Sequence, residues 1–290
     1  MQQRGKSFPG RQSYAEQGRS GRPKAILRLS LVFWYLWACL RYRVNPWNYF
    51  AINSPRFNWE KGIFSKLDMD ALIPPALRLR QHYYDAGVLP RHYPVFLKPE
   101  WGQNSKGVVR GAGENAYRGF EKTAGRGKIP YIVQEAGPGR KEFEVYYLRQ
   151  PGMKGKAAFL SVTEVVNCCE FHHPVNSIHN PCTRYREITP ELPAARLDMI
   201  WQAVKGIGDF PMARVGIKAD SWQAVTQGRF KVVEINLFLP MPLVLFTENI
   251  SFLKKQMIIL YTMHLAARLA KQAPAQHSGL KVFFKKMMKM

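Results

Sequence analysis

Acidic residues are scarce in this 290-residue chain, which has 20 Asp and Glu against 43 Lys and Arg. The resulting formal net charge of +23 at pH 7 favours anionic partners such as nucleic acid, anionic lipid or anionic substrates. Cysteine is also scarce, and the spacing of the four cysteines does not form a regular disulfide framework. We therefore expect a reducing compartment and a cytoplasmic protein.

Long hydrophobic runs are lacking as well. The apolar segment Leu29–Leu40 is shorter than the roughly 20 residues that a membrane-spanning helix needs. It also starts too late for a secretory signal and lacks a small-residue cleavage site. A helix over 25–43, flanked by Arg28 and Arg41, either packs into the core or lies on an anionic membrane surface. The second alternative would place the protein peripherally at the inner face of the membrane.

A glycine-bearing polar loop, Pro99–Gly107, lies between two expected strands, Val95–Lys98 and Val108–Arg110. It lacks the Gly-Lys-Ser/Thr ending and the following helix of a P-loop. Glycines nevertheless let a backbone approach a phosphate closely, and exposed N–H groups in such a loop can cradle it. An ordinary hairpin with glycine in its turn is the alternative.

Hydrophobic periodicity and turn residues predict the remaining elements. Residues 1–24 hold almost nothing apolar, which predicts disorder. The lysine-rich end of the chain shows no evident fold. The expected helices are 75–86, 114–127, 190–206 and 249–271, and the further expected strands are 131–135, 142–148, 157–166, 213–218 and 229–236.

The last of these strands carries a pair of oxygen ligands. Alternate residues of a strand face the same side, so Glu234 and Asn236 project together. A carboxylate and an amide oxygen suit magnesium or calcium. Arg214 lies on the partner strand of the same hairpin. A polar strand end that enters a proline-rich turn is the alternative interpretation.

Cysteine and histidine gather in a loop over 168–186. Its candidate zinc ligands are Cys168, Cys169, His172, His173, His179 and Cys182. The usual CxxC and HxxxH spacings are missing, which favours a substrate-facing loop over a zinc site. Arg184 and Arg186 would suit a carboxylate or phosphate on the substrate.

Taken in order, these segments resemble the ATP-grasp superfamily, in the branch of D-alanine–D-alanine ligase and related carboxylate–amine ligases. The resemblance covers about Val95–Leu243 and rests on four loose motifs. They are the strand lysine with its loop (Lys98, Gly102, Ser105, Gly107), a hinge segment (Gln134, Glu135, Ala136), a Gly-x-x-Glu-Phe segment (Gly139, Glu142, Phe143) and a hairpin (Arg214, Lys218, Glu234, Asn236).

The resemblance implies an α+β fold of the ATP-grasp type, in which two lobes with antiparallel sheets grip ATP between them. The N-terminal region is too short for a complete substrate domain of that family. The expected parts are a disordered basic tail (1–24), a helical or irregular N-terminal region (25–94), a small lobe (95–150), a large lobe with the metal site (151–274) and a basic C-terminal tail (275–290).

The implied activity is an ATP-dependent ligase that joins a carboxylate to an amine through an acylphosphate. The nucleotide contacts would be Lys98, Gly102, Ser105 and Gly107 for the phosphates, Gln134, Glu135 and Ala136 for adenine, and Glu142 or Glu144 for the ribose. The catalytic candidates are Arg214 and Lys218. Glu234 and Asn236 would hold two Mg²⁺ ions, with Mn²⁺ as a substitute.

One position departs from the family. An acidic metal ligand usually follows two residues after the arginine, and Gly216 stands there. Either Asp220 supplies the missing ligand, or the site holds its metals with fewer carboxylates. The alternative is a degraded site in an ATP-binding protein at a membrane surface.

Other activities remain open, because a fold does not fix function. A kinase or an ester- or thioester-forming ligase would use the same fold. The expected partners are ATP, a small carboxylate and a nucleophile, and a homodimer is the commonest assembly. Nucleic acid ranks last, because aromatic and basic residues are not interleaved as on a stacking platform.

Overall fold

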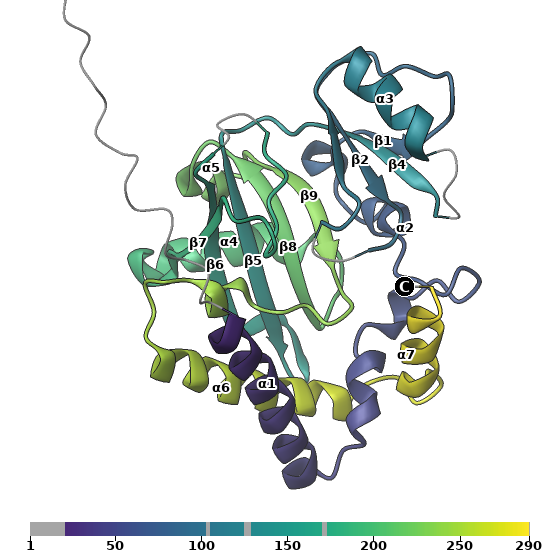
Figure 1. Ribbon diagram of the computed structural model, residues 1–290. Coiled ribbons are helices and arrows are strands. Elements are labelled where there is room, and N and C mark those ends of the chain that lie inside the picture. Colours follow the sequence, from purple (N-terminus) through teal and green to yellow (C-terminus); the bar gives the residue numbers. More distant parts are fainter. Residues whose placement is uncertain (1–20, 103–104, 125–128, 170–172, 290) are drawn as a thin grey trace, which may run out of the picture.

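Two lobes, each built on an antiparallel sheet, make up the computed structural model (Figure 1). It describes residues 21–102, 105–124, 129–169 and 173–289. Most of the tail predicted over 1–24 therefore lies outside the described residues. The predicted α+β class with two antiparallel sheets is confirmed.

The smaller lobe has a four-stranded sheet in the order β1-β4-β2-β3. Its strands are β1 (Gln81–Tyr83), β2 (Val95–Pro99), β3 (Val109–Gly111) and β4 (Tyr131–Glu135). Helix α3 (Glu114–Ala124) covers one face and buries Tyr117 and Phe120 against Val95, Leu97 and Val133. This cluster is the small lobe's own core.

The larger lobe has a five-stranded sheet in the order β7-β6-β5-β8-β9. Its strands are β5 (Lys141–Gln150), β6 (Met153–Asn167), β7 (Thr183–Glu187), β8 (Met212–Ala219) and β9 (Lys231–Asn236). Alternation along β5 sends Phe143, Val145 and Tyr147 to one face and the residues between them to the other. The two faces therefore have different coverings.

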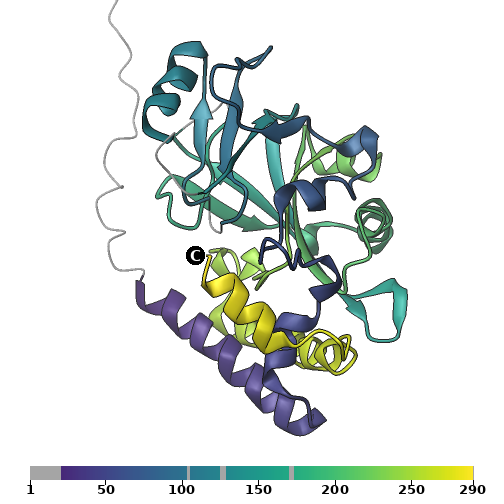
Figure 2. The same cartoon turned by 90° about the vertical axis from the view of Figure 1, so that its right-hand side faces the viewer.

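One face is packed throughout, by α4 (Ala194–Lys205), α5 (Trp222–Thr226) and the short α2 (Lys66–Asp70). The other face is divided. Its lower part lies against α1 (Gly21–Tyr42) and α6 (Phe252–Lys271), which pack along each other at the base of the molecule (Figures 1 and 2). Its upper part faces the small lobe, and this is where the cleft forms.

Short 3₁₀ turns connect these elements. They are η2 (Pro46–Ala51), η3 (Ser54–Arg56), η4 (Pro75–Leu77), η5 (Thr189–Glu191) and η6 (Leu243–Phe246). The link between the lobes passes Gly139, whose φ is +103°. A Cβ there would lie 2.7 Å from the backbone of Ala219, so only glycine fits where this link crosses the end of β8.

Three predictions about elements are wrong. The segment predicted as a helix over 75–86 forms η4 and β1, because Pro74 and Pro75 limit it to one tight turn. The small lobe predicted over 95–150 ends earlier, since β5 pairs with β6 and β8. The lysine-rich end folds as α7 (Gly279–Met287), which is capped by Ser278 and packs on η2.

Helix α1 presents two different sides. Leu27, Tyr35, Ala38 and Cys39 are buried in the core shared with α6. The opposite side exposes apolar side chains, namely Ile26, Leu29, Val32, Phe33, Leu36, Trp37 and Leu40. Its window Ala25–Tyr42 is long and apolar enough to cross a membrane, and 22% of that window is buried. A single such helix is a weak sign, because core helices and signal sequences pass the same test.

Candidate functional site

The candidate site is the cleft between the two sheets, lined from below by β5, β8 and β9 and from above by β2 and β4. Strand register arranges its floor in cross-strand rows. Glu144, Gly216 and Glu234 form one row, and Lys218 pairs with Glu142 in the next. The sequence thus brings three glutamates from two strands into one cleft.

Gly216 stands in this row, at the position where the resemblance led us to expect an acidic ligand. A Cβ at Gly216 would lie 3.2 Å from Oε1 of Glu144 and 3.1 Å from Cγ of Glu234. The glycine therefore leaves room for the glutamates of the neighbouring strands to converge. The carboxylate missing from β8 is present one strand away, on β5.

Arg214 links this row to the large lobe. Its Nε lies 3.2 Å from Oε2 of Glu144, and its Nη2 lies 3.6 Å from Oε1 of Glu234. Asn236 Nδ2 donates to Oε1 of Glu234 over 2.7 Å. The side chain of Arg214 is only 11% exposed, so its charge acts in a desolvated setting.

Lys98 faces the glutamates from the small lobe. It is 6% exposed, and its Nζ donates to Oε1 of Gln134 over 2.6 Å. Gln134 Nε2 in turn donates to the backbone oxygen of Val233 on β9 over 3.1 Å. These bonds connect the two lobes directly across the cleft.

Burial and charge act against each other among these groups. Burial raises the pKa of Glu144 to about 8 against the pull of Arg214, and burial also raises the pKa of Glu142. Burial alone would raise the pKa of Glu234 too, but Arg214 and Lys98 hold that pKa below its ordinary value. Glu234 is thus the carboxylate that these cations keep ionised at neutral pH.

The lysines of the cleft also have shifted pKa values, again because of burial. Burial lowers the pKa of Lys98, with Glu234 opposing the shift. Burial lowers the pKa of Lys66 to about 8. Perturbed titratable groups that converge in a cleft are typical of functional sites.

A loop of the large lobe closes one side of the cleft. Asn176 Nδ2 donates to Oε2 of Glu142 over 3.1 Å, and its backbone oxygen accepts from Ser105 Oγ over 2.7 Å. Lys218 Nζ lies 4.0 Å from the same oxygen of Glu142. The glycine-bearing loop and the loop over 168–186 therefore meet above Glu142.

A disulfide joins Cys169 and Cys182 at the base of the second loop. The expectation that the cysteines form no disulfide is wrong for this pair, because loop ends can meet in space at any sequence spacing. The sulfur of Cys168 lies within 4.8 Å of both. A bridged pair offers no thiolates, so the described part of this cluster is not a zinc site. His172 lies outside the described residues.

Most predicted site residues line the cleft together. They are Lys98, Gly102, Ser105, Gln134, Glu135, Glu142, Glu144, Arg214, Lys218, Glu234 and Asn236. Gly107 instead forms a turn with φ +77° beside Pro99 and Tyr131. The N–H of Ala136 is bonded to the oxygen of Pro94, within the small lobe.

Asp220 does not reach the site. It is exposed just beyond the end of β8. It follows Gly216 by four residues along an extended chain, which is a distance of about 13 Å. The prediction that Asp220 supplies the missing ligand is therefore contradicted, and Glu144 lies where that ligand was expected.

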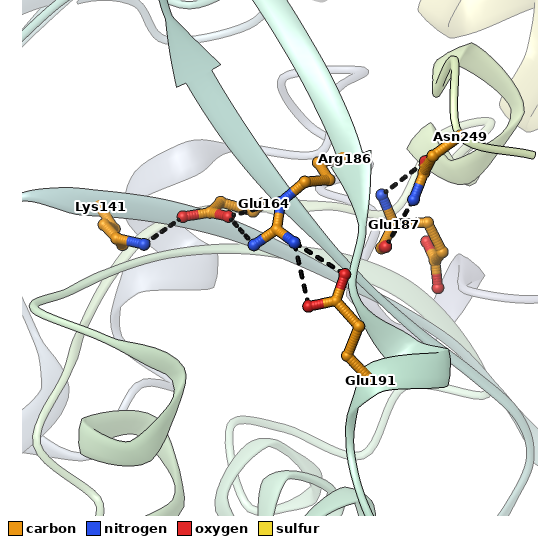
Figure 3. Close-up of polar contacts among 6 residues, drawn as sticks. All are labelled: Lys141, Glu164, Arg186, Glu187, Glu191 and Asn249. Atoms are coloured by element: carbon orange, nitrogen blue, oxygen red, sulfur yellow. Dashed lines mark hydrogen bonds and ion pairs between the residues drawn. The ribbon is translucent and has the colours of Figure 1, made fainter.

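Arg186 does not reach the site either. It pairs with Glu164 and Glu191, with shortest distances of 2.6 and 2.7 Å, and Glu164 also pairs with Lys141 (Figure 3). Alternation along β6 and β7 sends these side chains away from the cleft face. The expectation that Arg186 binds substrate is therefore wrong.

Two cleft residues escaped the sequence interpretation. Lys66 enters from α2, where its Nζ donates to the oxygen of Pro99 over 2.6 Å. Asn176 lies in an irregular loop. Neither stands in a recognisable motif, although the Ser65 cap that begins α2 was visible in the sequence.

The cleft is narrow. It encloses about 100 Å³, against roughly 300–1,000 Å³ for typical ligand pockets. The Lys98–Gln134–Val233 chain of hydrogen bonds spans it. A nucleotide would have to separate the lobes or displace these side chains.

Comparison with solved structures finds chains that are similar to this one, among them ligases. D-alanine–D-alanine ligase from Bacillus anthracis is 16% identical, with a TM-score of 0.49 over 72% of this chain and 69% of that one. The complex of that ligase with ATP is also 16% identical, with a TM-score of 0.44 over 70% of this chain and 67% of that one. The VanG D-Ala:D-Ser ligase from Enterococcus faecalis is 14% identical, with a TM-score of 0.45 over 73% of this chain and 70% of that one.

The sequence comparisons found nothing comparable. No protein-family model matches the chain, and no curated protein matches it. Identities of 14–16% and TM-scores below 0.5 leave activity, substrates and metal to be argued from this chain's own residues.

Proposed function

We propose that the cleft binds magnesium–ATP and that the protein joins a carboxylate to an amine through an acylphosphate. One observation carries the proposal: a buried lysine on one lobe faces the buried Glu144, the half-buried Glu234 and an arginine on the other. Lys98 would neutralise phosphate charge as a point charge, and Arg214 would stabilise the oxyanion that develops at the acyl group.

The residues present fit a divalent cation. Glu144 and Glu234 converge beside Gly216, and Asn236 adds an amide oxygen. Oε2 of Glu144 is buried and accepts no hydrogen bond within the described residues, although Nε of Arg214 lies 3.2 Å away as an ion-pair partner. Hard oxygen donors of this kind suit Mg²⁺ or Mn²⁺, and we propose these three residues as ligands. A bound cation would neutralise phosphate charge there.

The reaction has two balanced steps. A carboxylate oxygen forms a bond to the γ-phosphorus, while the bond to the β-phosphate oxygen breaks and ADP leaves with the electron pair. The amine nitrogen then bonds to the acyl carbon, phosphate leaves, and the nitrogen loses a proton. The task of Lys98, Lys66 and Arg214 is to position and neutralise the anions while water is excluded.

A thermal shift with magnesium–ATP tests the nucleotide site. Ligand at a hundredfold excess over its dissociation constant stabilises the folded state by about 2.7 kcal/mol. We expect a magnesium-dependent shift that is lost in Lys98→Ala and Glu234→Ala and kept in Lys271→Ala, an exposed lysine of α6. Folded protein that shows no shift at millimolar magnesium–ATP would remove the nucleotide site from the account.

A kinase is the second candidate on the same residues. Both activities need the phosphate contacts, so the cleft favours neither. Product analysis separates them: the ligase releases ADP and phosphate with an amide, whereas a kinase leaves the phosphoryl group on the product.

Peripheral contact with an anionic membrane is a further proposal. The exposed apolar side of α1, with Leu29, Phe33 and Trp37, ends near Arg41 and Arg43. Apolar side chains with basic flanks are typical of helices at an interface. Sedimentation with anionic vesicles is expected to bring down the parent and not Phe33→Asp/Trp37→Asp; equal recovery of both would refute the contact.

A further inference from the structure

A second, larger hollow lies beside the cleft. This groove encloses about 650 Å³ under α1, between that helix, η2 and the segment after β9. Its walls are mostly apolar and aromatic, with Val32, Leu36, Trp47, Phe50 and Leu239 among them. The proposed nucleotide chemistry makes no use of it.

The groove adjoins the cleft. Three residues line both hollows: Arg214, Asn236 and Ile178. Arg214 therefore stands where the apolar groove meets the polar cleft, with a side chain that is 11% exposed and that already faces Glu144 and Glu234. A molecule lying in the groove would bring its head group to the residues proposed for acyl activation.

Charge selects what the head group can be. The residues that line the groove in the described part of the chain include Arg28, His179 and Arg214 and no aspartate or glutamate. An amine or other cation would meet no counter-charge among the residues that line the groove, whereas a carboxylate at its cleft end would share the guanidinium of Arg214 with Glu144 and Glu234. The apolar walls in turn favour an extended hydrocarbon body.

We propose that the carboxylate substrate is an apolar acid, such as a medium-chain fatty acid, whose body fills the groove and whose carboxylate lies at Arg214. The inference rests on the proposed ligase function for its chemistry, and on the groove alone for its binding. The groove thus selects the acid, and the cleft supplies the phosphoryl donor.

Chain length gives the first test. With magnesium–ATP and hydroxylamine as the nucleophile, hydroxamate formation is measured for acetate, butyrate, octanoate and decanoate below micelle-forming concentrations. We expect kcat/KM to rise about three- to fourfold per added methylene until the groove is filled, as expected for burial of hydrocarbon. A preference for acetate, or rates independent of chain length, would overturn the proposal.

A matched pair of variants gives the second test. Val32 lines the groove, whereas Leu29 does not, and both are exposed on α1. Val32→Glu places a carboxylate against the bound chain, so we expect decanoate affinity to fall at least about tenfold, as for loss of a hydrophobic contact with an added desolvated charge. Leu29→Glu should bind decanoate like the parent, and both variants should keep the magnesium–ATP shift.

Direct binding of decanoate, followed by tryptophan fluorescence without ATP, separates this proposal from the proposed function. Binding that is lost in Val32→Glu, with no turnover of any acid, would keep the groove assignment and refute the ligase. A magnesium–ATP shift with no decanoate binding would refute the apolar acid and leave the nucleotide site intact. Equal loss in Val32→Glu and Leu29→Glu would also overturn the groove assignment.

Discussion

The cleft and the groove differ in almost every physical property, although they share Arg214 as a wall. The cleft is narrow and charged, with acids and bases that perturb one another's pKa values. The groove is more than six times as large by volume, about 650 against 100 Å³, and its lining is mostly hydrocarbon. A triphosphate would have no place in the second, and a hydrocarbon chain no place in the first.

The difference teaches how one sheet face can serve two ligands. Along β8, Lys218 and Gly216 belong to the cleft, Arg214 to both hollows, and Met212 to the core under α6. From Lys218 to Met212, every second side chain of β8 lies on this face. The face therefore changes from polar to apolar along the strand. A linear substrate aligned with this gradient would lie with its reactive end at Arg214.

The largest expected effect is on ATP turnover, when the carboxylate of Glu144 on β5 is removed or a carboxylate is added at Gly216 on β8. Glu144→Ala should lower ATP turnover at least about hundredfold, because a metal ligand is lost, yet keep decanoate binding, because Arg214 loses a competing carboxylate. Gly216→Asp alone should also lower turnover, since its Cβ would lie 3.2 Å from Oε1 of Glu144 and its carboxylate would crowd the two glutamates of the row. Turnover with the coupled release of ADP is the measurement.

The double variant decides whether Glu144 replaces the missing acid. Glu144→Ala/Gly216→Asp removes the close contact and returns a carboxylate to the same cross-strand row. We expect it to recover at least about a tenth of the lost activity, which corresponds to restoring about half of the free energy lost in a hundredfold decrease. A double variant no more active than either single variant would show that Glu144 is not the substitute ligand.

A middle-sized effect concerns the stability of the fold around α7. Lys286 of α7 is 3% exposed, and burial lowers its pKa to about 8 from the ordinary lysine value of 10.5. The folded state is therefore penalised while Lys286 is charged, and stability rises as pH increases between these two values. Lys286→Met should stabilise the fold by about 1–3 kcal/mol at pH 7, because a buried polar group is removed.

The pH dependence of that gain is its control. The advantage of Lys286→Met should shrink as pH rises above 8 and vanish near 10.5, where the parent lysine is neutral in both states. Urea unfolding at several pH values measures it. A gain that is constant with pH would attribute the effect to packing and not to charge.

The smallest expected effect falls on both hollows equally. The Cys169–Cys182 bridge closes the loop that carries Asn176 and Ile178. Asn176 contacts Glu142 in the cleft, and Ile178 lines cleft and groove alike. Cys169→Ser loosens this loop, so magnesium–ATP and decanoate should both bind about two- to fivefold more weakly, as for an ordering cost below about 1 kcal/mol. A change in one ligand only would show that the loop serves a single hollow.

The sequence predicted β2, β4, β5, β8 and β9 because their signals are local, whereas β1 and β7 lie where we expected a helix and a loop. Val95–Lys98 and Tyr131–Glu135 stand between turn residues, and the alternation along 142–148 and 229–236 is visible without a structure. Ordered motifs along these strands also placed Lys98, Arg214 and Glu234 in one cleft. Local patterning and motif order were sufficient for these residues.

The rest depends on contacts between distant segments. Glu144 could be assigned to the row of Gly216 only once β5 was known to pair with β8. The position of Lys66 depends on how α2 packs, and the groove depends on how α1 packs. The apolar side of α1 has the same sequence pattern whether it contacts a core, a membrane or a ligand. The lysines of α7 hid from the sequence interpretation the apolar residues Val282, Phe283 and Phe284, of which Phe283 and Phe284 contact the aromatic rings of η2.

The most direct test of the central claim follows an oxygen atom. Decanoate labelled with heavy oxygen in its carboxylate is incubated with magnesium–ATP and hydroxylamine, and the released phosphate is examined by phosphorus NMR. Activation through an acylphosphate predicts that one labelled oxygen appears in each phosphate released with hydroxamate. Phosphate that carries no label while ADP accumulates would mean that water, not the acid, receives the phosphoryl group, and would contradict the account.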